Sequence, residues 1–233
     1  MNTPPSKNLY LTSEYLSKNP TWHEQDSAWK ARQIKQLLVK YKLGVRTISE
    51  IGCGAGGVLL ALYKEYPEIE FFGYEISPSA LELAKKKQNS HINFSQIQSE
   101  SQCNFADLML CIDVLEHVED CYSFLRNVRS LSQWKVFHIP LEINVLAVLR
   151  GNFVEARENI GHIHLFDTKT ALSVLRETGY EIVDFCFTPG YETWPCNSFK
   201  SKIIQKSRRF LHEKNPDLLS KLIGGLSLLV LAK

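Results

Sequence analysis

The feature that most constrains the fold is a glycine-rich turn between an apolar run and a helical pattern. The turn reads Glu50-Ile51-Gly52-Cys53-Gly54-Ala55-Gly56-Gly57 and joins a predicted strand at 45–51 to a predicted helix at 58–65. Glycine has no Cβ atom, so the backbone of this turn can approach a ligand closely, and the helix that follows presents unpaired N–H donors. The pattern therefore predicts a nucleotide-like ligand at the end of the first strand.

The glycine spacing alone leaves the kind of nucleotide open. Gly52, Gly54 and Gly57 also satisfy the GxGxxG pattern of enzymes that bind dinucleotides. Glu75 ends the second predicted strand, about 20 residues beyond the glycines, where a carboxylate can accept hydrogen bonds from ribose hydroxyls. The alternative is that Glu75 only begins the turn that caps the next helix.

Short β-rich runs alternate with helical patterns along the chain, as in parallel sheets that are covered on both faces. We expect strands at 45–51, 69–74, 91–97, 106–112, 135–139, 180–187 and 226–232, and helices at 58–65, 78–88, 120–131 and 167–178. The run 106–112 is apolar except for Asp107, which indicates a central strand, whereas 91–97 is polar enough for a position near the edge. The predicted fold class is a Rossmann-like, doubly wound α/β sheet of about seven strands, mostly parallel with a terminal antiparallel strand and with helices on both faces.

One structural domain is expected, with a helical N-terminal cap or extension at residues 1–44 and the main domain at residues 45–233. The extension carries Tyr10, Tyr15, Trp22 and Trp29 and a helical pattern over 23–41. Aromatic side chains of this kind either cover a ligand pocket or pack on the sheet. Both possibilities stay open.

Composition argues against several classes of protein. The formal net charge is +2 and charges of both signs are interspersed, so we expect no nucleic-acid partner and no membrane partner. The N-terminus has no basic segment followed by an apolar run, which predicts a cytoplasmic protein, and the apolar run at 226–232 is too short to span a bilayer. The six cysteines fall in no ligand spacing, so we expect neither a disulfide framework nor a metal site.

Three segments together resemble the class I S-adenosylmethionine-dependent methyltransferases, from about Trp22 to the C-terminus. In that family an acidic residue stands two positions before the first glycine, as Glu50 does here. The segment 107–118, Asp-Leu-Met-Leu-Cys-Ile-Asp-Val-Leu-Glu-His-Val, is similar to the family's fourth strand and the turn after it, which dehydrogenases do not share. The segment 161–166, Gly-His-Ile-His-Leu-Phe, with the helix and the two strands that follow it, is similar to the later part of many small-molecule members.

The resemblance implies S-adenosylmethionine as the cofactor and assigns residues to each part of it. The glycine-rich turn would line the methionine, Glu75 would bind the ribose and Ile76 would pack on the adenine. The family often has an aspartate for the adenine amino group, and the nearest candidates here are Gln98, Ser99 and Glu100. The expected cofactor-binding residues are Glu50, Gly52, Cys53, Gly54, Gly56, Glu75, Ile76, Gln98, Ser99, Asp113 and Val114.

Methyl transfer asks little of catalytic side chains because the carbon on the sulfonium is already activated. The protein mainly aligns the acceptor with the S–CH₃ bond, and a general base helps where the acceptor is a hydroxyl or an amine. The catalytic candidates are His162, His164 and Glu142; the two histidines alternate on an extended segment, so one of them should face the pocket. His117 and His138 are interpreted as a turn residue and a core residue.

The predicted function is methyl transfer to a small-molecule acceptor, such as a sugar or another metabolite, at oxygen, nitrogen or carbon. The first alternative is an NAD(P)-dependent oxidoreductase, which the glycines permit but segment 107–118 disfavours. The second is a methyltransferase-like binding module without activity, because a fold alone does not fix a function.

Overall fold

The computed structural model describes residues 24–151, 153–194 and 197–233, together with Tyr10, Tyr15, Ser17, Asn19, Thr21 and Trp22. Seven strands form one sheet in the order β3-β2-β1-β4-β5-β7-β6. The strands are β1 (Thr47–Ile51), β2 (Glu70–Glu75), β3 (Ile92–Gln96), β4 (Ala106–Ile112), β5 (Ser132–Pro140), β6 (Ile182–Thr188) and β7 (Ser227–Ala232). The first five run parallel, and β7 lies antiparallel between β5 and β6. The predicted fold class is confirmed.

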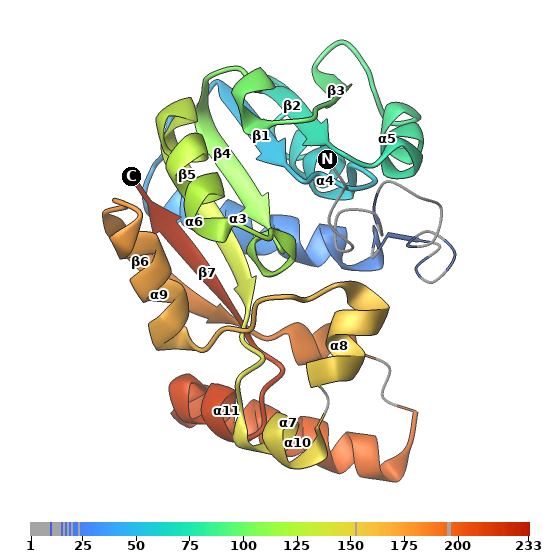
Figure 1. Ribbon diagram of the computed structural model, residues 1–233, viewed down its shortest axis with the longest axis vertical. Helices are drawn as coiled ribbons and strands as arrows, with labels where there is room; N and C mark the ends of the chain where they lie inside the picture. Colours follow the sequence, from blue (N-terminus) through green and yellow to red (C-terminus); the bar gives the residue numbers. More distant parts are fainter. Residues whose placement is uncertain are drawn as a thin grey trace.

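Helices cover both faces of the sheet (Figure 1). On one face lie α3 (Ser27–Lys40), α4 (Gly57–Tyr63) and α5 (Pro78–Lys85), whose buried side chains share one apolar cluster with β1, β2 and β4. On the other face lie α6 (Cys121–Val128) and α9 (Thr168–Glu177), which share a second cluster with the opposite side of the same strands. The sheet is therefore doubly wound.

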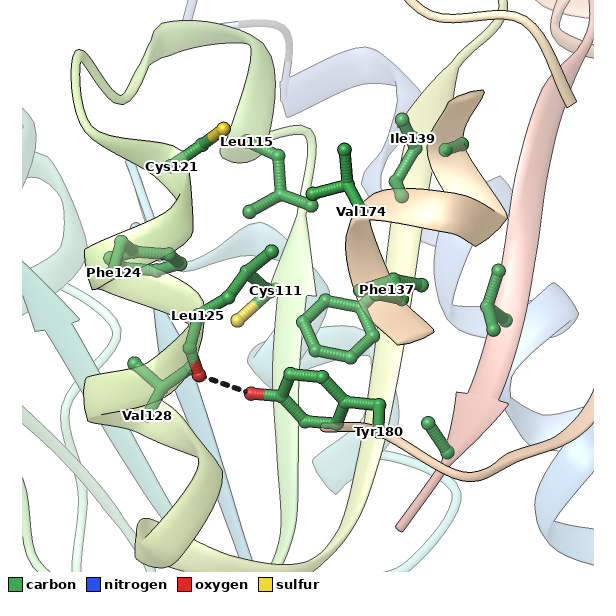
Figure 2. Packing of buried hydrophobic residues seen from close by; sticks show 14 of the residues in the cluster. Cys111, Leu115, Cys121, Phe124, Leu125, Val128, Phe137, Ile139, Val174 and Tyr180 are labelled. Carbon is green, nitrogen blue, oxygen red and sulfur yellow. Dashed lines mark hydrogen bonds between the residues drawn. The ribbon is translucent and has the colours of Figure 1, made fainter. Parts of the chain in front are cut away.

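The central strand β4 shows why its sequence is almost wholly apolar. Successive side chains of a strand point to opposite faces, so Leu108 and Leu110 enter the α3–α4 cluster while Met109 and Cys111 enter the α6–α9 cluster. Figure 2 shows the second cluster, in which the buried hydroxyl of Tyr180 is paired because it donates a 2.7 Å hydrogen bond to the carbonyl of Leu125. Burial on both faces fixes β4, and with it the position of the loop at its tip.

Local signals at helix ends agree with the structure. The Ser77 side chain accepts a hydrogen bond from the backbone of Ala80, and Pro78 is the first residue of α5. Asp167 caps α9, and Gly179, at φ 93°, follows the end of that helix. These caps determine where the chain turns back toward the sheet.

Four helices were not predicted as separate elements: α7 (Val145–Arg150), α8 (Phe153–Ile160), α10 (Phe199–Lys214) and α11 (Pro216–Leu222). They lie beyond the carboxyl ends of the parallel strands (Figure 1). The basic stretch at 200–209 belongs to α10, in which no described side chain is buried. Within the described ranges, no helix combines the length and the apolarity that crossing a bilayer requires.

Candidate active site

A cavity of about 860 Å³ opens at the carboxyl ends of β1, β2 and β4. These ends are level with one another, because Ile51 pairs with Tyr74 on one side and with Cys111 on the other. In open α/β sheets this edge is where ligands bind. Of the expected cofactor-binding residues, the structure brings all but Gly56 to this cavity: Glu50, Gly52, Cys53, Gly54, Glu75, Ile76, Gln98, Ser99, Asp113 and Val114.

The turn after β1 presents bare backbone to the cavity. The N–H groups of Gly52 and Cys53 both donate to the carbonyl of Tyr74, at 2.8 and 3.1 Å, which fastens the turn to β2. Gly54 has φ +53°, and the nearest atom to a Cβ placed there would be a carbon of Trp22 at 3.8 Å. A side chain at residue 54 would therefore enter the space that a ligand can use.

Gly56 has a different role from the one expected of it. It has φ +77° and is the N-cap of α4, and a Cβ at this residue would lie 2.5 Å from the ring of Phe94 and 3.3 Å from Ala84. The glycine thus allows α4 to approach β3 and α5 closely, and it does not line the cavity. The structure thus gives Gly56 a packing role, and its expected contact with the cofactor stays a prediction.

The Glu75 carboxylate links the ends of β1 and β2. Oε2 accepts a hydrogen bond from the N–H of Gly54, and Oε1 accepts from the N–H groups of Ile76 and Ser77, all at 2.8 Å. Burial raises the pKa of this carboxyl, and the three backbone donors oppose that rise. Glu75 therefore does more than begin a capping turn, because it holds the glycine-rich turn in place.

Glu50 is a second carboxylate at this edge, and it is 2% exposed. Burial raises its pKa to about 8, although the neighbouring Lys30 works in the opposite direction. Within the described part of the chain, Oε2 of Glu50 has no hydrogen-bond partner. A buried carboxylate oxygen of this kind is satisfied by a cationic or hydrogen-bonding ligand.

Asp113 stands at the tip of β4 with an unusual backbone, at φ 54°. One carboxylate oxygen accepts from Nδ1 of His138 at 2.5 Å, and the other lies 2.7 Å from Nζ of Lys30. Burial alone would raise the pKa of Asp113, but these two cations hold it well below its usual range. The contacts with His138 and Lys30 hold the backbone of Asp113 in a conformation that residues other than glycine rarely adopt.

His138 is buried and belongs to this network, as its interpretation as a core residue requires. The Thr188 hydroxyl donates its hydrogen to the carbonyl of Ser227 at 3.2 Å, so its oxygen accepts from Nε2 of His138 at 2.9 Å. Both ring nitrogens of His138 therefore carry hydrogen. The ring of His138 does not line the main cavity. It holds the Asp113 carboxylate in position from β5.

The expected adenine contacts lie together at one end of the cavity. Gln98 and Ser99 follow β3, and the side chain of Gln102 accepts from the N–H of Gln98 at 2.6 Å. Ser99 caps the short helix η2 (Glu100–Gln102). Val114 also lines the cavity, and a Cβ placed on Gly52 would lie 2.7 Å from a methyl carbon of Val114.

Of the catalytic candidates, His162 reaches the main cavity and His164 does not. Nδ1 of His162 lies 2.7 Å from Oε2 of Glu142, which itself lines a neighbouring cavity. Nε2 of His164 instead donates to the backbone carbonyls of Val118 and Glu119, at 2.9 and 3.2 Å. The structure thus brings His162 and Glu142 together and turns His164 away.

Several cavity residues were not singled out from the sequence. Lys30 comes from α3 and reaches Asp113 across 83 positions of the chain, and no local pattern signals such a contact. Glu116 follows β4 in the short helix η3 (Leu115–His117), and it is fully buried with its pKa raised well above the ordinary value by burial and by the nearby Asp113 and Glu142. Tyr10, Tyr15 and Trp22 also line the cavity, whereas Ile34 and Leu37 of α3 pack on the sheet.

A second cavity of about 470 Å³ adjoins the first. Both are lined by Asp26, Lys30, Asp113, Pro140 and Ser227, so the tip of β4 lies between them. The second cavity extends under α7, α8 and α10, where apolar side chains such as Leu146, Phe153 and Trp194 lie beside Arg150 and Arg208. Its position suits a molecule that reacts with a ligand in the first cavity.

Comparison with known proteins gives a family and a fold. Residues 21–184, well over half of the chain, match a family model described as a methyltransferase domain. A curated relative is an uncharacterized protein of Mycoplasma pneumoniae, the MG259 homolog, which is 28% identical over 91 residues. The match covers 38% of this chain and 20% of that protein, so the aligned part is a fifth of the relative's length.

Solved structures of low sequence identity share the fold. The magnesium protoporphyrin IX methyltransferase of Synechocystis PCC 6803, solved with bound S-adenosylhomocysteine (SAH), has a TM-score of 0.59 at 15% identity and covers 93% of this chain and 85% of its own. A possible histamine N-methyltransferase of Thermotoga maritima has a TM-score of 0.61 at 16% identity and covers 97% of this chain and 99% of its own. With the family match and the glycine-rich turn at the cavity, the chain belongs to the methyltransferase-domain family, the class I S-adenosylmethionine-dependent methyltransferases.

Proposed function

We propose that this protein transfers the methyl group of S-adenosylmethionine to a small-molecule acceptor that occupies the second cavity. The observation that carries the proposal is the pair of adjoining cavities, which meet at Asp113 at the end of the central strand. One holds the expected cofactor-binding residues, and the other is an open space whose lining mixes apolar side chains with charged ones such as Arg150 and Arg208. A donor and an acceptor bound side by side need only be aligned for transfer.

In this proposal each group of the cofactor has a partner in the main cavity. Glu50, whose buried oxygen is unsatisfied among the described residues, attracts the ammonium of the methionine part. The backbone at Gly52 and Gly54 lies along the methionine, and Glu75 receives the ribose hydroxyls. Ile76 packs on the adenine, whose amino group meets Gln98 or Ser99. Val114 and Asp113 face the carbon that is transferred.

The charge of the cavity supports a cationic cofactor over a dinucleotide. Glu50, Glu75, Asp113 and Glu116 all line it, and Lys30 is the one lysine or arginine among the described residues of its wall. S-adenosylmethionine carries a sulfonium and an ammonium against one carboxylate, whereas the pyrophosphate of NAD adds two negative charges. Glu50 and Glu116, whose pKa values are raised by burial, can lose a proton beside a cationic ligand. The pyrophosphate of NAD would instead lie beside these carboxyl groups with Lys30 as its one cationic partner among the described lysines and arginines of the wall.

The reaction needs little beyond alignment. A lone pair of the acceptor forms a bond to the methyl carbon, and the pair of the C–S bond goes to sulfur, which yields SAH. Where the acceptor is a hydroxyl or an amine, its proton passes to Nε2 of His162, while Glu142 orients that ring through Nδ1. His162 is therefore our candidate base, with Glu142 as its positioning residue.

The residues before β1 form the cap of this site in our proposal. Tyr10, Tyr15 and Trp22 line the main cavity, which supports a covering role for part of residues 1–44. No nucleic-acid partner is proposed. A cytoplasmic location also stays a prediction, and the free thiols of the described cysteines, Cys53, Cys103, Cys111, Cys121 and Cys186, are in keeping with a reducing compartment.

Calorimetric titration of the full chain with S-adenosylmethionine, SAH and NAD tests the cofactor. We expect the first two to bind and NAD not to bind; saturable NAD binding would favour the oxidoreductase. Turnover of a labelled methyl donor against a panel of metabolites then tests the transfer. Cofactor binding without transfer to any member of a broad panel would favour the binding module.

A further inference from the structure

We propose that Glu116, His117 and His162 bind a divalent transition-metal ion in the wall of the main cavity. Each side chain offers one ligand atom, and these atoms all lie within 4.8 Å of one another. The site is separate from the glycine-rich turn and lies in the wall of the main cavity, into which the reacting atom of an acceptor held in the second cavity would have to reach. The inference deepens the proposed function, on which its catalytic meaning rests, because the ion would select acceptors that present an oxygen atom.

Glu116 is the observation that points to a ligand. Its side chain lines the cavity and is 0% exposed, and within the described ranges neither carboxylate oxygen has a hydrogen-bond donor. Nε2 of His117 lies 3.9 Å from Oε1, beyond hydrogen-bond distance. A buried carboxylate without donors is costly, and such groups are commonly paired with a cation or with a metal ion.

The hydrogen bonds of His162 direct its other ring nitrogen for binding a metal. Nδ1 donates to Oε2 of Glu142 at 2.7 Å, so the lone pair of the neutral ring is on Nε2. A carboxylate behind a histidine in this way is the usual support of a metal-bound imidazole, since it fixes the tautomer and increases the basicity of the ligand nitrogen. Glu142 would thus be a positioning residue for the ion.

His117 is held in the same tautomer by different partners. Its Nδ1 lies 3.1 Å from the carbonyl of Gly161 and 2.8 Å from the hydroxyl of Tyr10. Tyr10 donates its own hydrogen to the carbonyl of Ile160 at 3.0 Å, so both neighbours of Nδ1 accept and the nitrogen carries hydrogen. The lone pair of neutral His117 is therefore on Nε2, the nitrogen nearer to Glu116.

The backbone fixes the distance between the two segments that carry the ligands. The carbonyl of Glu116 accepts from the N–H groups of Ile163 and His164, at 2.8 and 3.1 Å. The rings of His117 and His162 consequently lie with their centroids 4.8 Å apart. The ligands thus come from η3 and from the loop before α9, which are far apart in the sequence. This separation explains why the sequence spacing predicted no metal site.

Two imidazole nitrogens and one carboxylate oxygen suit zinc, manganese, iron(II) or cobalt(II) better than calcium. An ion about 2.1 Å from its ligands would hold neighbouring ligand atoms about 3.0–3.4 Å apart, so small movements of the side chains would close the site. Three protein ligands leave a coordination position open toward the cavity. An acceptor oxygen bound there would be more acidic. Because Nε2 of His162 would bind the ion, this assignment replaces His162 as the candidate base, and the acceptor proton would pass to cavity water instead.

Titration of the metal-free full chain with Co²⁺ tests the site, because Co²⁺ bound to imidazole and carboxylate has visible absorption bands that report its coordination. We expect one Co²⁺ per chain, and we expect Glu116→Gln and His162→Ala to weaken binding by about tenfold or more, with Glu142→Gln weakening it less. His164→Ala is the matched control, since this histidine lies two residues away and donates to the backbone carbonyls of Val118 and Glu119, outside the wall of the main cavity; Co²⁺ binding should be unchanged.

Absence of saturable Co²⁺ binding to folded protein at about millimolar Co²⁺, a concentration far above what a three-ligand site needs, would overturn the inference. Equal Co²⁺ affinity in the wild type and in both ligand variants would do the same, because the ion would then be bound elsewhere. Circular dichroism of each variant separates lost ligands from lost folding. SAH binding measured on the same samples separates the two proposals: SAH binding without Co²⁺ binding rejects the metal site alone, and the reverse result rejects the methyltransferase proposal alone.

Discussion

Asp113 and His138 are joined by a 2.5 Å hydrogen bond at the tip of the central strand, where Asp113 adopts a left-handed backbone. Lys30 completes the arrangement, with its Nζ 2.7 Å from the other carboxylate oxygen. The three residues come from β4, β5 and α3, so the ion pair also couples the covering helix to the sheet.

Lys30→Met should lower the free energy of unfolding by about 1–3 kcal/mol at neutral pH, because Asp113 would keep its charge with one cationic partner fewer. Urea unfolding measures the loss. The pKa of Asp113 is depressed, so the stabilisation it provides is present above the unfolded value of about 3.9 and is lost as the pH falls toward the folded value. The difference between the two proteins should therefore shrink in acid.

Lys35→Met is the control on the same helix. Lys35 pairs with Glu65 on the exposed side of α3, where solvent screens the attraction, so this change should hardly alter the urea midpoint. If both substitutions had the same effect, the Asp113 pair would be no stronger than a surface pair.

The two glycines of the turn should respond differently to alanine. Gly54→Ala should weaken SAH binding strongly with a modest loss of stability, because the new methyl group enters the cavity. Gly56→Ala should instead destabilise the fold by about 1–3 kcal/mol, since its Cβ would overlap the ring of Phe94. Calorimetric titration and thermal unfolding of both variants measure the two effects, and a Gly56 variant as stable as the wild type would contradict the close packing.

Glu75→Ala should weaken SAH binding by about 1–3 kcal/mol, through loss of the ribose contact and of the bond that holds Gly54. Glu70→Ala, at the other end of the same strand, is a suitable control because Glu70 pairs with His91 far from the cavity. Calorimetry gives both affinities. Unchanged affinity in the Glu75 variant would count against the proposed orientation of the cofactor.

Glu50 predicts a pH dependence of cofactor binding. Its pKa is raised to about 8, so near pH 7 most of the free protein holds a proton that the cofactor ammonium should displace. SAH affinity should therefore increase with pH up to about 8, and binding near pH 7 should release a proton. Calorimetry in two buffers of different ionisation enthalpy detects that proton, and Glu50→Gln should abolish its release; an identical release in the variant would assign the proton to another group.

The same carboxyl predicts how stability changes with pH. A carboxyl whose folded pKa is raised contributes stability that is fully present below its unfolded pKa, about 4.3, and that is lost as the pH rises through about 8. As the pH rises from about 4.3 to about 8, the free energy of unfolding should therefore fall less in Glu50→Gln than in the wild type. Urea unfolding at a series of pH values measures the slope for both proteins, and parallel slopes would contradict the raised pKa.

The sequence predicted the sheet well because its strands are buried in a regular way. The run 106–112 matches β4 in full, since a strand covered on both faces must be apolar at nearly every position. The polar run 91–97 corresponds to β3 at the edge of the sheet. In contrast, α7 and α8 carry exposed apolar residues such as Val148 and Val154, so their patterns do not show the usual division into a buried and an exposed face.

The site was predictable where it depends on the turn and unpredictable where it depends on distant contacts. Glu50, Gly54 and Glu75 follow from strand ends that must meet at one edge. Lys30 and the orientation of His164 depend on how far helices and loops reach across the sheet, and no spacing in the sequence encodes that. The aromatic residues of the N-terminal segment have both expected roles, since Trp22 lines the cavity while Trp29 packs in a T-shape against His138.

The three backbone donors around Glu75 have a consequence for the proposed binding of the ribose by this residue. Because Gly54, Ile76 and Ser77 already anchor both oxygens, the carboxylate is immobile before anything arrives, and its remaining lone pairs point in directions set by the main chain. Little side-chain entropy is then lost on association, and a nucleoside whose hydroxyls are missing or inverted finds a rigid acceptor that cannot adjust to it.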